Sequence, residues 1–321
     1  MQEALAVAEG RPTVRDRSAA ALAMRKSEWV ILAFLAYAAV VSFLLPVAAR
    51  VRYQLCWVNV PLFCAVALVA HLDSQKPRPA LSVVRDWLPL ALVILAYREM
   101  GWFAAPHAGS VLESHWVVWD RVVLRGGGKA AIEALGPLLP SVLEIAYSLV
   151  YTLAPFSVAL LYLNGRRKSV DQFLFVFVLA VLVCYAQFPF WPSQPPRVVF
   201  FGQDFPAYDT IFRRFNLWML GSCGIHTSVF PSAHVAGAFG AAFGLRQAMP
   251  SRRWAFRLLT VIAVLIAIAT VYGRYHYLAD ASAGLVMAVF AAAIAHRREP
   301  VDAGTGRRPY PDSSTEWADA R

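Results

Sequence analysis

The chain has 321 residues, of which 59% are hydrophobic and only 16% are charged, and its formal net charge at pH 7 is +10. Soluble domains are about half apolar and about a quarter charged, so this composition indicates a membrane protein. The basic residues form short clusters between apolar blocks, as membrane insertion requires, and we therefore expect no nucleic-acid partner. The four cysteines show no CxxC spacing, so neither a disulfide framework nor a zinc ribbon is expected.

In chain order, the sequence predicts an all-α fold, a polytopic transmembrane helical bundle between two polar tails. An apolar block of about 20 residues is long enough to cross a bilayer as a helix. Such blocks occur at 29–48, 54–72, 86–104, 141–163, 170–190, 231–249, 254–272 and 277–296. The second and third are the least regular, because they contain Asn59, Pro61, Arg98 and Glu99. Residues 1–28 and 298–321 are expected to be tails, the latter disordered, around one transmembrane domain at 29–297.

The distribution of basic residues predicts the orientation of the spans. With eight spans, 20 lysines and arginines lie on the side of the two termini and nine on the opposite side. Because cytoplasmic segments carry the excess of basic residues, both termini are expected in the cytoplasm of a cell-membrane protein. Two long stretches, 105–140 and 191–230, are then extracytoplasmic loops. Loops longer than about 15 residues are usually functional or disordered, so these two are candidate site regions.

Three short polar segments are expected to meet at the extracytoplasmic face. The first is Pro195-Pro196-Arg197 after span five, the second is 230–234 at the start of span six, and the third is 273–280 at the start of span eight. Span five exits at this face and span six re-enters from it, and spans seven and eight repeat the pattern. The predicted topology therefore brings the three segments together.

The second and third segments contain side chains that suit phosphoryl transfer. Pro231 is favourable in the first turn of a helix, whose free N–H groups bind anions, and Ser232 adds a hydroxyl donor. His276 and Asp280 are four residues apart and therefore share one helix face. A carboxylate that accepts the Nδ1–H bond fixes the histidine tautomer and leaves Nε2 free to attack. The second histidine, His234, can then protonate the leaving oxygen.

Arginines in the first and third segments supply positive charge. The planar guanidinium groups of Arg197 and Arg274 suit binding of phosphate oxygens through paired N–H groups. This set of residues requires no metal and no other cofactor. The expected partners are a lipid phosphate as substrate and the surrounding membrane lipids.

The second and third segments resemble two signatures of the type-2 phosphatidic acid phosphatase superfamily of lipid phosphatases and phosphotransferases. The Phe-Pro-Ser-Ala-His string at 230–234 is similar to the family's Pro-Ser-x-His signature. Its His-Tyr-x-x-Asp-x-x-x-Gly signature is matched by His276, Tyr277, Asp280 and Gly284. The resemblance implies a six-helix phosphatase-like core and a phosphohistidine intermediate. It implies His276 as nucleophile, Asp280 as its orienting partner, His234 as general acid and Ser232 as a phosphate ligand.

The sequence departs from the family pattern at the arginines. The family's first signature has a lysine before Arg-Pro, whereas no lysine follows Lys168 here and the string is Pro-Pro-Arg. The third signature has an arginine upstream of its histidine, where this chain has Thr270, and Arg274 is the expected substitute. The strings 119–121 and 143–155 look similar to the upstream part of inositol phosphorylceramide synthases. The expected reaction is therefore hydrolysis of a lipid (di)phosphate or transfer of a phosphate group, including phosphoinositol, to an alcohol.

Two other classes of function remain open from the residues alone. A transporter or channel would place functional polar residues along the membrane interior, whereas here they gather at one face. A metal-dependent membrane hydrolase would need a zinc-ligand set such as His226, His234, His276 and Asp280, although the neighbouring arginines would repel the cation. If the protein is not a metal hydrolase, His226 is a possible substrate-binding residue.

Overall fold

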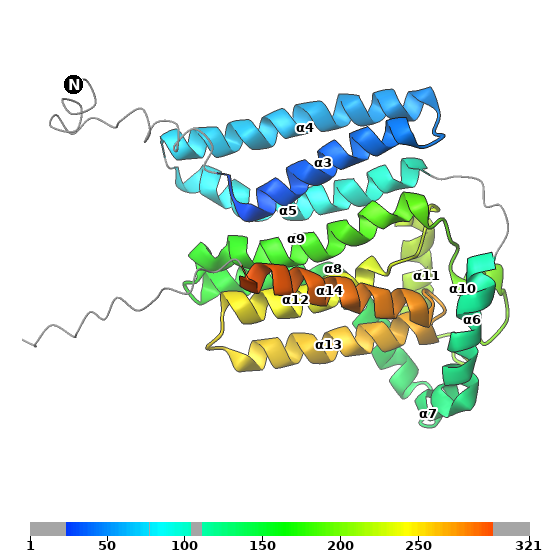
Figure 1. Cartoon of the computed structure of the whole chain (residues 1–321). Helices are drawn as coiled ribbons and strands as arrows, with labels where there is room; N and C mark the ends of the chain where they lie inside the picture. Colours follow the sequence, from blue (N-terminus) through cyan, green and yellow to red (C-terminus); the bar gives the residue numbers. More distant parts are fainter. Residues whose placement is uncertain (1–23, 77, 104–110, 298–321) are drawn as a thin grey trace, which may run out of the picture.

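The computed structural model describes residues 24–76, 78–103 and 111–297, and within these ranges it contains helices and no strand. Seven of the described helical stretches are long and apolar enough to cross a membrane, which confirms the all-α polytopic bundle (Figure 1). Apart from 24–28, the predicted tails 1–28 and 298–321 lie outside the described residues. The α-helices are α3 (Lys26–Leu44), α4 (Ala49–Gln75), α5 (Pro79–Met100), α6 (Val111–Val123), α7 (Lys129–Glu133), α8 (Leu138–Leu163), α9 (Val170–Gln187), α10 (Pro196–Val199), α11 (Ile211–Cys223), α12 (Ala233–Ala248), α13 (Arg253–Tyr272) and α14 (Leu278–Arg297).

The sixth predicted span, 231–249, is a shorter helix at the centre of the bundle. Helix α12 has 16 residues, which is about 24 Å of helix and less than the roughly 30 Å thickness of a bilayer core. It packs against α8, α9, α13 and α14, and most of its side chains are buried. A Cβ atom added at Gly244 would lie 2.8 Å from the Phe173 carbonyl oxygen, so glycine permits the close approach of α9. Because its neighbours surround it, α12 needs neither the length nor the uniform hydrophobicity of a lipid-facing span.

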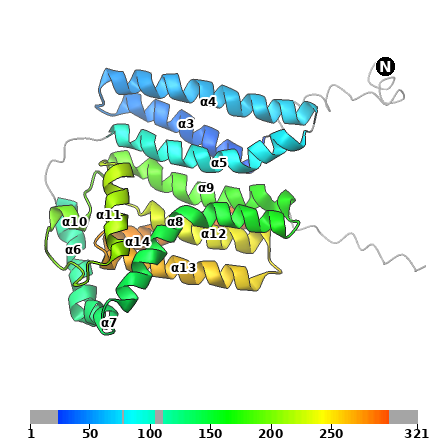
Figure 2. The ribbon, with the colours of Figure 1, turned by 180° about the vertical axis from the view of Figure 1, so that it is seen from behind.

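Helices α3, α4 and α5 form a second group on one side of the bundle (Figures 1 and 2). Both α3 and α5 pack against α9, and α4 packs outside them. Large apolar side chains cover the outer surface of α4, and Trp57 is 78% exposed, as expected of a helix that faces lipid.

The irregular polar residues of α4 and α5 differ in their surroundings. Asn59 donates a hydrogen bond to the Leu35 carbonyl oxygen at 3.1 Å. Arg98 donates to the Cys223 carbonyl oxygen at 2.7 Å, and Glu99 is fully buried. Polar side chains in membrane spans are tolerated where they face protein. Asn59 and Glu99 satisfy that condition, whereas the Arg98 side chain is exposed.

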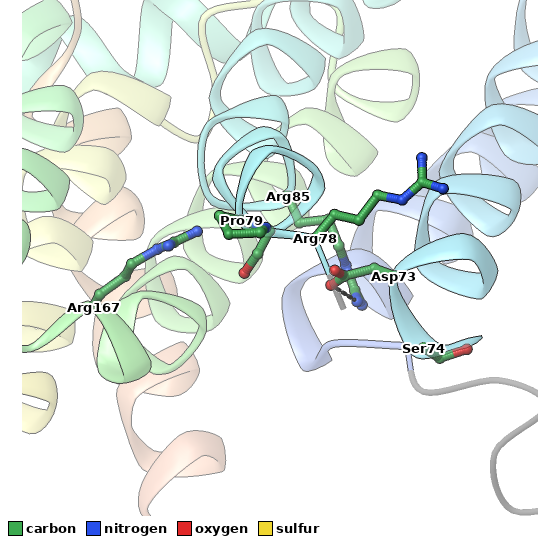
Figure 3. Close-up of a pocket in the computed structure, with 7 residues that line it drawn as sticks. Asp73, Ser74, Arg78, Pro79, Arg85 and Arg167 are labelled. Carbon is green, nitrogen blue, oxygen red and sulfur yellow. Dashed lines mark hydrogen bonds and ion pairs between the residues drawn. The ribbon is translucent and has the colours of Figure 1, made fainter. Parts of the chain in front are cut away.

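Ion pairs join the helices at one end of the bundle, and at least one side chain of each pair is buried. Arg85 of α5 lies 2.7 Å from Glu28 of α3 and 2.8 Å from Asp73 of α4. Asp86 lies 2.8 Å from Arg167, which belongs to the turn between α8 and α9. Figure 3 shows Asp73, Arg85 and Arg167 around a cavity of about 480 Å³ at this end. The two pairs of Arg85 hold α3, α4 and α5 together, and the Asp86–Arg167 pair joins this group to the rest of the bundle.

The other end of the bundle carries the three polar segments. The end of α9, the start of α12 and the turn between α13 and α14 all lie there (Figure 1). Helices α6 and α7 arise from the stretch predicted as a loop at 105–140, and α10 and α11 arise from 191–230. Figures 1 and 2 show these four helices at the same end. The fold therefore places residues 111–140 and 191–230, the described parts of the two predicted loops, beside the candidate site.

Candidate active site

Two backbone hydrogen bonds join the three polar segments. The Arg197 N–H donates to the Arg274 carbonyl oxygen at 3.1 Å, which links the segment after α9 to the turn before α14. The Ser232 N–H donates to the Asp280 carbonyl oxygen at 3.0 Å, which links the start of α12 to the first turn of α14. A Cβ atom added at Gly284 would lie only 2.4 Å from the Ser232 carbonyl oxygen, so glycine is required at this approach. The three segments are therefore in direct contact.

Ser232 is the N-cap of α12. The helix begins at Ala233, and Ser232 Oγ accepts the Val235 N–H bond at 3.4 Å. Pro231 therefore precedes the cap, and the prediction that it occupies the first helical turn was wrong by two positions. The Ser232 hydroxyl uses one lone pair in this bond and keeps its own hydrogen as a donor.

The two histidines contact each other directly. His234 Nδ1 lies 3.2 Å from His276 Nε2. His276 Nδ1 lies 3.0 Å from the Val229 carbonyl oxygen and 3.3 Å from Asp280 Oδ2. Because a carbonyl oxygen only accepts, His276 Nδ1 carries the hydrogen and its Nε2 presents a lone pair. That lone pair needs a donor opposite it, so the hydrogen of neutral His234 is on Nδ1.

The surroundings of His276 favour the neutral ring. Burial, which is the largest effect, and the charge of Arg197 together lower the pKa of His276 to about 3, and the hydrogen bond to Val229 opposes this shift. A neutral imidazole is the form that can act as a nucleophile. Asp280 Oδ2 also accepts the Tyr277 N–H bond at 2.9 Å, which fixes the carboxylate against the histidine.

Arg197 supplies positive charge beside the histidines. Its guanidinium group lies over the Tyr275 ring, 5.7 Å from the ring centroid. Burial lowers the pKa of Arg197, but arginine remains protonated in proteins. A charged guanidinium group held by an aromatic ring is well placed to attract a phosphate.

Arg274 lies in the turn between α13 and α14 with a φ of 62°, which is the left-handed region that few residues other than glycine adopt. Its side chain is fully buried, and Nη1 lies 2.5 Å from Asp120 Oδ2. Nε and Nη2 are buried without a hydrogen-bond partner, so within the described residues no hydrogen bond joins Arg274 to either histidine. The predicted binding of phosphate by Arg274 stays a prediction, because its side chain is fully buried.

Asp120 of α6 was not assigned to the site by sequence reasoning. Besides pairing with Arg274, its Oδ1 accepts the Leu278 N–H bond at 2.8 Å, at the first residue of α14. Asp120 therefore ties α6 to the turn that carries His276. The sequence offered one signal, the Trp-Asp-Arg string at 119–121 with its similarity to the synthase branch, but spacing alone could not connect it to Arg274.

Two tyrosines of α8 were also missed. The hydroxyl groups of Tyr147 and Tyr151 lie 3.4 Å and 3.5 Å from His234 Nε2. The Tyr147 ring stacks on the His234 ring with centroids 5.1 Å apart. Their separation of four residues places both on one face of α8, which is a detectable pattern. Nothing in the sequence connected that face to His234.

His226 is exposed in the loop before α12. Its possible contact with substrate stays a prediction, because the described structure assigns it no partner in the cluster of His234, His276 and Asp280. Within the described ranges, no group of three or more His, Cys, Asp or Glu side chains has a geometry that could hold a metal ion.

Comparison with known proteins supports the family resemblance. The sequence model of the PAP2 superfamily matches residues 130–294, a region that contains all three polar segments. The chain is similar to a PA-phosphatase related-family protein of Dictyostelium discoideum, with 30% identity over 106 residues, which is 31% of this chain. It spans only 18% of the length of that relative. No solved structure matches significantly. Because the family match covers half of the sequence, the chain belongs to the PAP2 superfamily.

Proposed function

We propose that this protein is an integral-membrane lipid phosphatase or phosphotransferase that acts through a phosphohistidine at the extracytoplasmic face. The observation that carries the proposal is the 3.2 Å contact between His234 Nδ1 and His276 Nε2. The second ring nitrogen of His276 is held by Val229 and Asp280. Membership of the PAP2 superfamily supports a lipid phosphate as substrate.

In the first step, the His276 Nε2 lone pair forms a bond to phosphorus while the bond from phosphorus to the lipid oxygen breaks. His234, neutral in the free site, first takes up a proton from water on Nε2, which the bound phosphate anion favours. The leaving oxygen then takes the Nδ1 proton of this imidazolium, and neutral His234 with its hydrogen on Nε2 remains. Arg197 and the N-terminus of α12 stabilise charge on the remaining phosphate oxygens. The phosphate must lie between the two ring nitrogens, so their 3.2 Å contact opens when substrate binds.

In the second step, an acceptor oxygen forms a bond to phosphorus while the bond from phosphorus to His276 Nε2 breaks. His234 Nδ1, deprotonated by the first step, takes the proton of the acceptor. Water as acceptor releases phosphate, and an alcohol as acceptor yields a phosphodiester lipid. The chemistry at the histidines is the same for phosphatidic acid, a polyprenyl (di)phosphate or a phosphoinositol lipid, so the groups beyond the phosphate decide between them.

The test of this function uses the purified full-length protein with a panel of these lipid phosphates. Free phosphate and new phosphodiester lipid are measured in parallel, with acid-labile radiolabel on the protein as the readout of phosphohistidine. We expect His276→Ala to abolish the label. We expect His234→Ala to lose about 100- to 10,000-fold in rate with an alkyl leaving group and much less with an aryl phosphate, which needs no proton.

Two results would contradict this assignment. Rescue of His276→Ala by the aryl substrate, with no rescue of His234→Ala, would reverse the two histidines. Activity near wild type in both variants would exclude the histidine mechanism.

The proposed orientation has its own test. It rests on the excess of basic residues on the side of the two termini, opposite to the end that carries the histidines. Asp209 has an exposed side chain at the end that holds the histidines. In a chain whose native cysteines are replaced by serine, Asp209→Cys should react with a membrane-impermeant thiol reagent in intact cells. Labelling only after lysis would place the site on the cytoplasmic face.

A further inference from the structure

We propose that Tyr147 and Tyr151 are positioning residues that hold the general acid His234 through its Nε2 atom. This inference rests on the proposed function, because it assigns to His234 the proton that the leaving oxygen receives. Neither tyrosine lies in any of the three polar segments. Both belong to α8, and their hydroxyl groups face the nitrogen of His234 that points away from His276.

The directions of these hydrogen bonds are determined by the Val229 carbonyl oxygen, which is the last acceptor in the series of bonds. The Val229 carbonyl fixes the hydrogen on His276 Nδ1, His276 Nε2 then accepts from His234 Nδ1, and His234 Nε2 is left with a lone pair. A tyrosine hydroxyl can donate to that lone pair. The distances of 3.4 Å and 3.5 Å are long, and catalytic hydrogen bonds often shorten only when substrate is bound.

A hydroxyl group suits this position because it both donates and accepts. When His234 is neutral with its hydrogen on Nδ1, a tyrosine O–H donates to Nε2. When His234 is the imidazolium that protonates the leaving oxygen, Nε2–H donates to the tyrosine oxygen. After Nδ1 gives its proton away, the hydrogen remains on Nε2, and Nδ1 is free to take the proton of the acceptor. A tyrosine hydroxyl can therefore stay hydrogen-bonded to His234 Nε2 in both steps, and no proton passes between the two groups.

Tyr147 is the more rigid of the two. Its ring lies between the rings of His234 and Tyr275, with centroid distances of 5.1 Å and 4.4 Å. The Tyr275 hydroxyl donates to Glu144 Oε2 at 2.6 Å, and Arg213 of α11 holds the same carboxylate at 3.2 Å. Tyr147 is 1% exposed and Tyr151 is 49% exposed. The buried stack fixes the Tyr147 hydroxyl, and Tyr151 completes the pair from the surface of α8.

The test removes the hydroxyl groups and keeps the rings. Tyr147→Phe, Tyr151→Phe and the double variant are compared with Tyr162→Phe. This control changes the same helix, but its hydroxyl bonds Asp86 at the other end of the bundle. The rate of phosphoenzyme formation is measured by rapid quench with a lipid phosphate and with an aryl phosphate. For the double variant we expect a loss of about tenfold with the lipid phosphate, the effect of one or two neutral hydrogen bonds, and less than about twofold with the aryl phosphate.

The loss of rate on each substrate tests the role of the two tyrosines. Equal loss on both substrates would show that the tyrosines only support packing, and rates equal to those of Tyr162→Phe on both would show that they do not act on His234. Either result would overturn the inference and leave the phosphohistidine mechanism standing. A wild-type protein that forms no phosphoenzyme would overturn the proposed function and this inference with it. Because Tyr151 is half-exposed, Tyr151→Phe retains the fold if Tyr147→Phe does not, and it must show the same difference between substrates on a smaller scale.

Discussion

The Asp120–Arg274 pair gives the sharpest stability prediction. Both side chains are fully buried, and the two charges are 2.5 Å apart. Asp120→Asn removes the negative charge and turns an amide N–H₂ or a single carbonyl oxygen toward Nη1, while Arg274 stays buried and charged. Breaking a buried pair by removing one partner costs about 3–5 kcal/mol, because the remaining charge is left uncompensated.

Asp120→Ala should cost more than Asp120→Asn. Alanine also removes the acceptor of the Leu278 N–H bond, which is at the start of α14. Loss of such a capping acceptor adds about 1 kcal/mol. By contrast, replacing both partners with apolar residues, Asp120→Leu with Arg274→Met, should recover most of the loss, because no unpaired charge remains.

The assay is the unfolding of the purified protein in a mild detergent, followed as a function of added denaturing detergent. The matched control is Asp209→Asn, which breaks a pair with Arg214 whose side chains are 61% and 66% exposed. Exposed pairs contribute little to stability, so this variant should unfold like wild type. If Asp120→Asn were no less stable than Asp209→Asn, the reasoning from burial would be refuted.

Three further predictions concern the site. The folded pKa of His276, about 3, lies below its ordinary value of 6.5, so neutral His276 stabilises the fold above pH 6.5 and this contribution is lost as pH falls toward 3. Arg197→Gln removes a charge that lowers this pKa. In a profile of the rate of phosphoenzyme formation against pH, the fall at low pH (the acid limb) should therefore lie at higher pH than in wild type with the same substrate. An unchanged limb would contradict this. Gly284→Ala places a Cβ atom 2.4 Å from the Ser232 carbonyl oxygen and should lower both stability and activity, whereas Gly126→Ala, with no atom within 4 Å, should change neither. Phosphate release should survive strong chelation, because the positive charge comes from arginine and a helix N-terminus; loss restored by zinc would favour the metal-hydrolase alternative.

Much of the fold could be predicted because it depends on the length and hydrophobicity of short stretches of sequence. The apolar blocks predicted an all-α membrane bundle, since each block reports its own length and hydrophobicity. This pattern could not predict the position of each helix within the bundle. Residues 231–249 read as one more span, yet α12 is a short helix at the centre, because burial depends on which helices surround it.

The candidate site shows the same division. His276 and Asp280 could be paired from the sequence alone, because residues four apart share a helix face. The contact of His234 with His276 could be expected only from topology, and its 3.2 Å length comes from the fold. The direction of the hydrogen bond between the two histidines depends on the Val229 carbonyl, which no motif marks.

The tertiary structure alone decided the partners of the charged and aromatic groups. Arg274 and Asp120 are 154 residues apart in the chain, and no periodicity relates positions at that distance. The tyrosines of α8 reach His234 across 83 and 87 residues for the same reason. A sequence by itself determines which chemical groups are present and how neighbours along a helix are spaced. Which of those groups meet is decided by the packing of whole helices against one another.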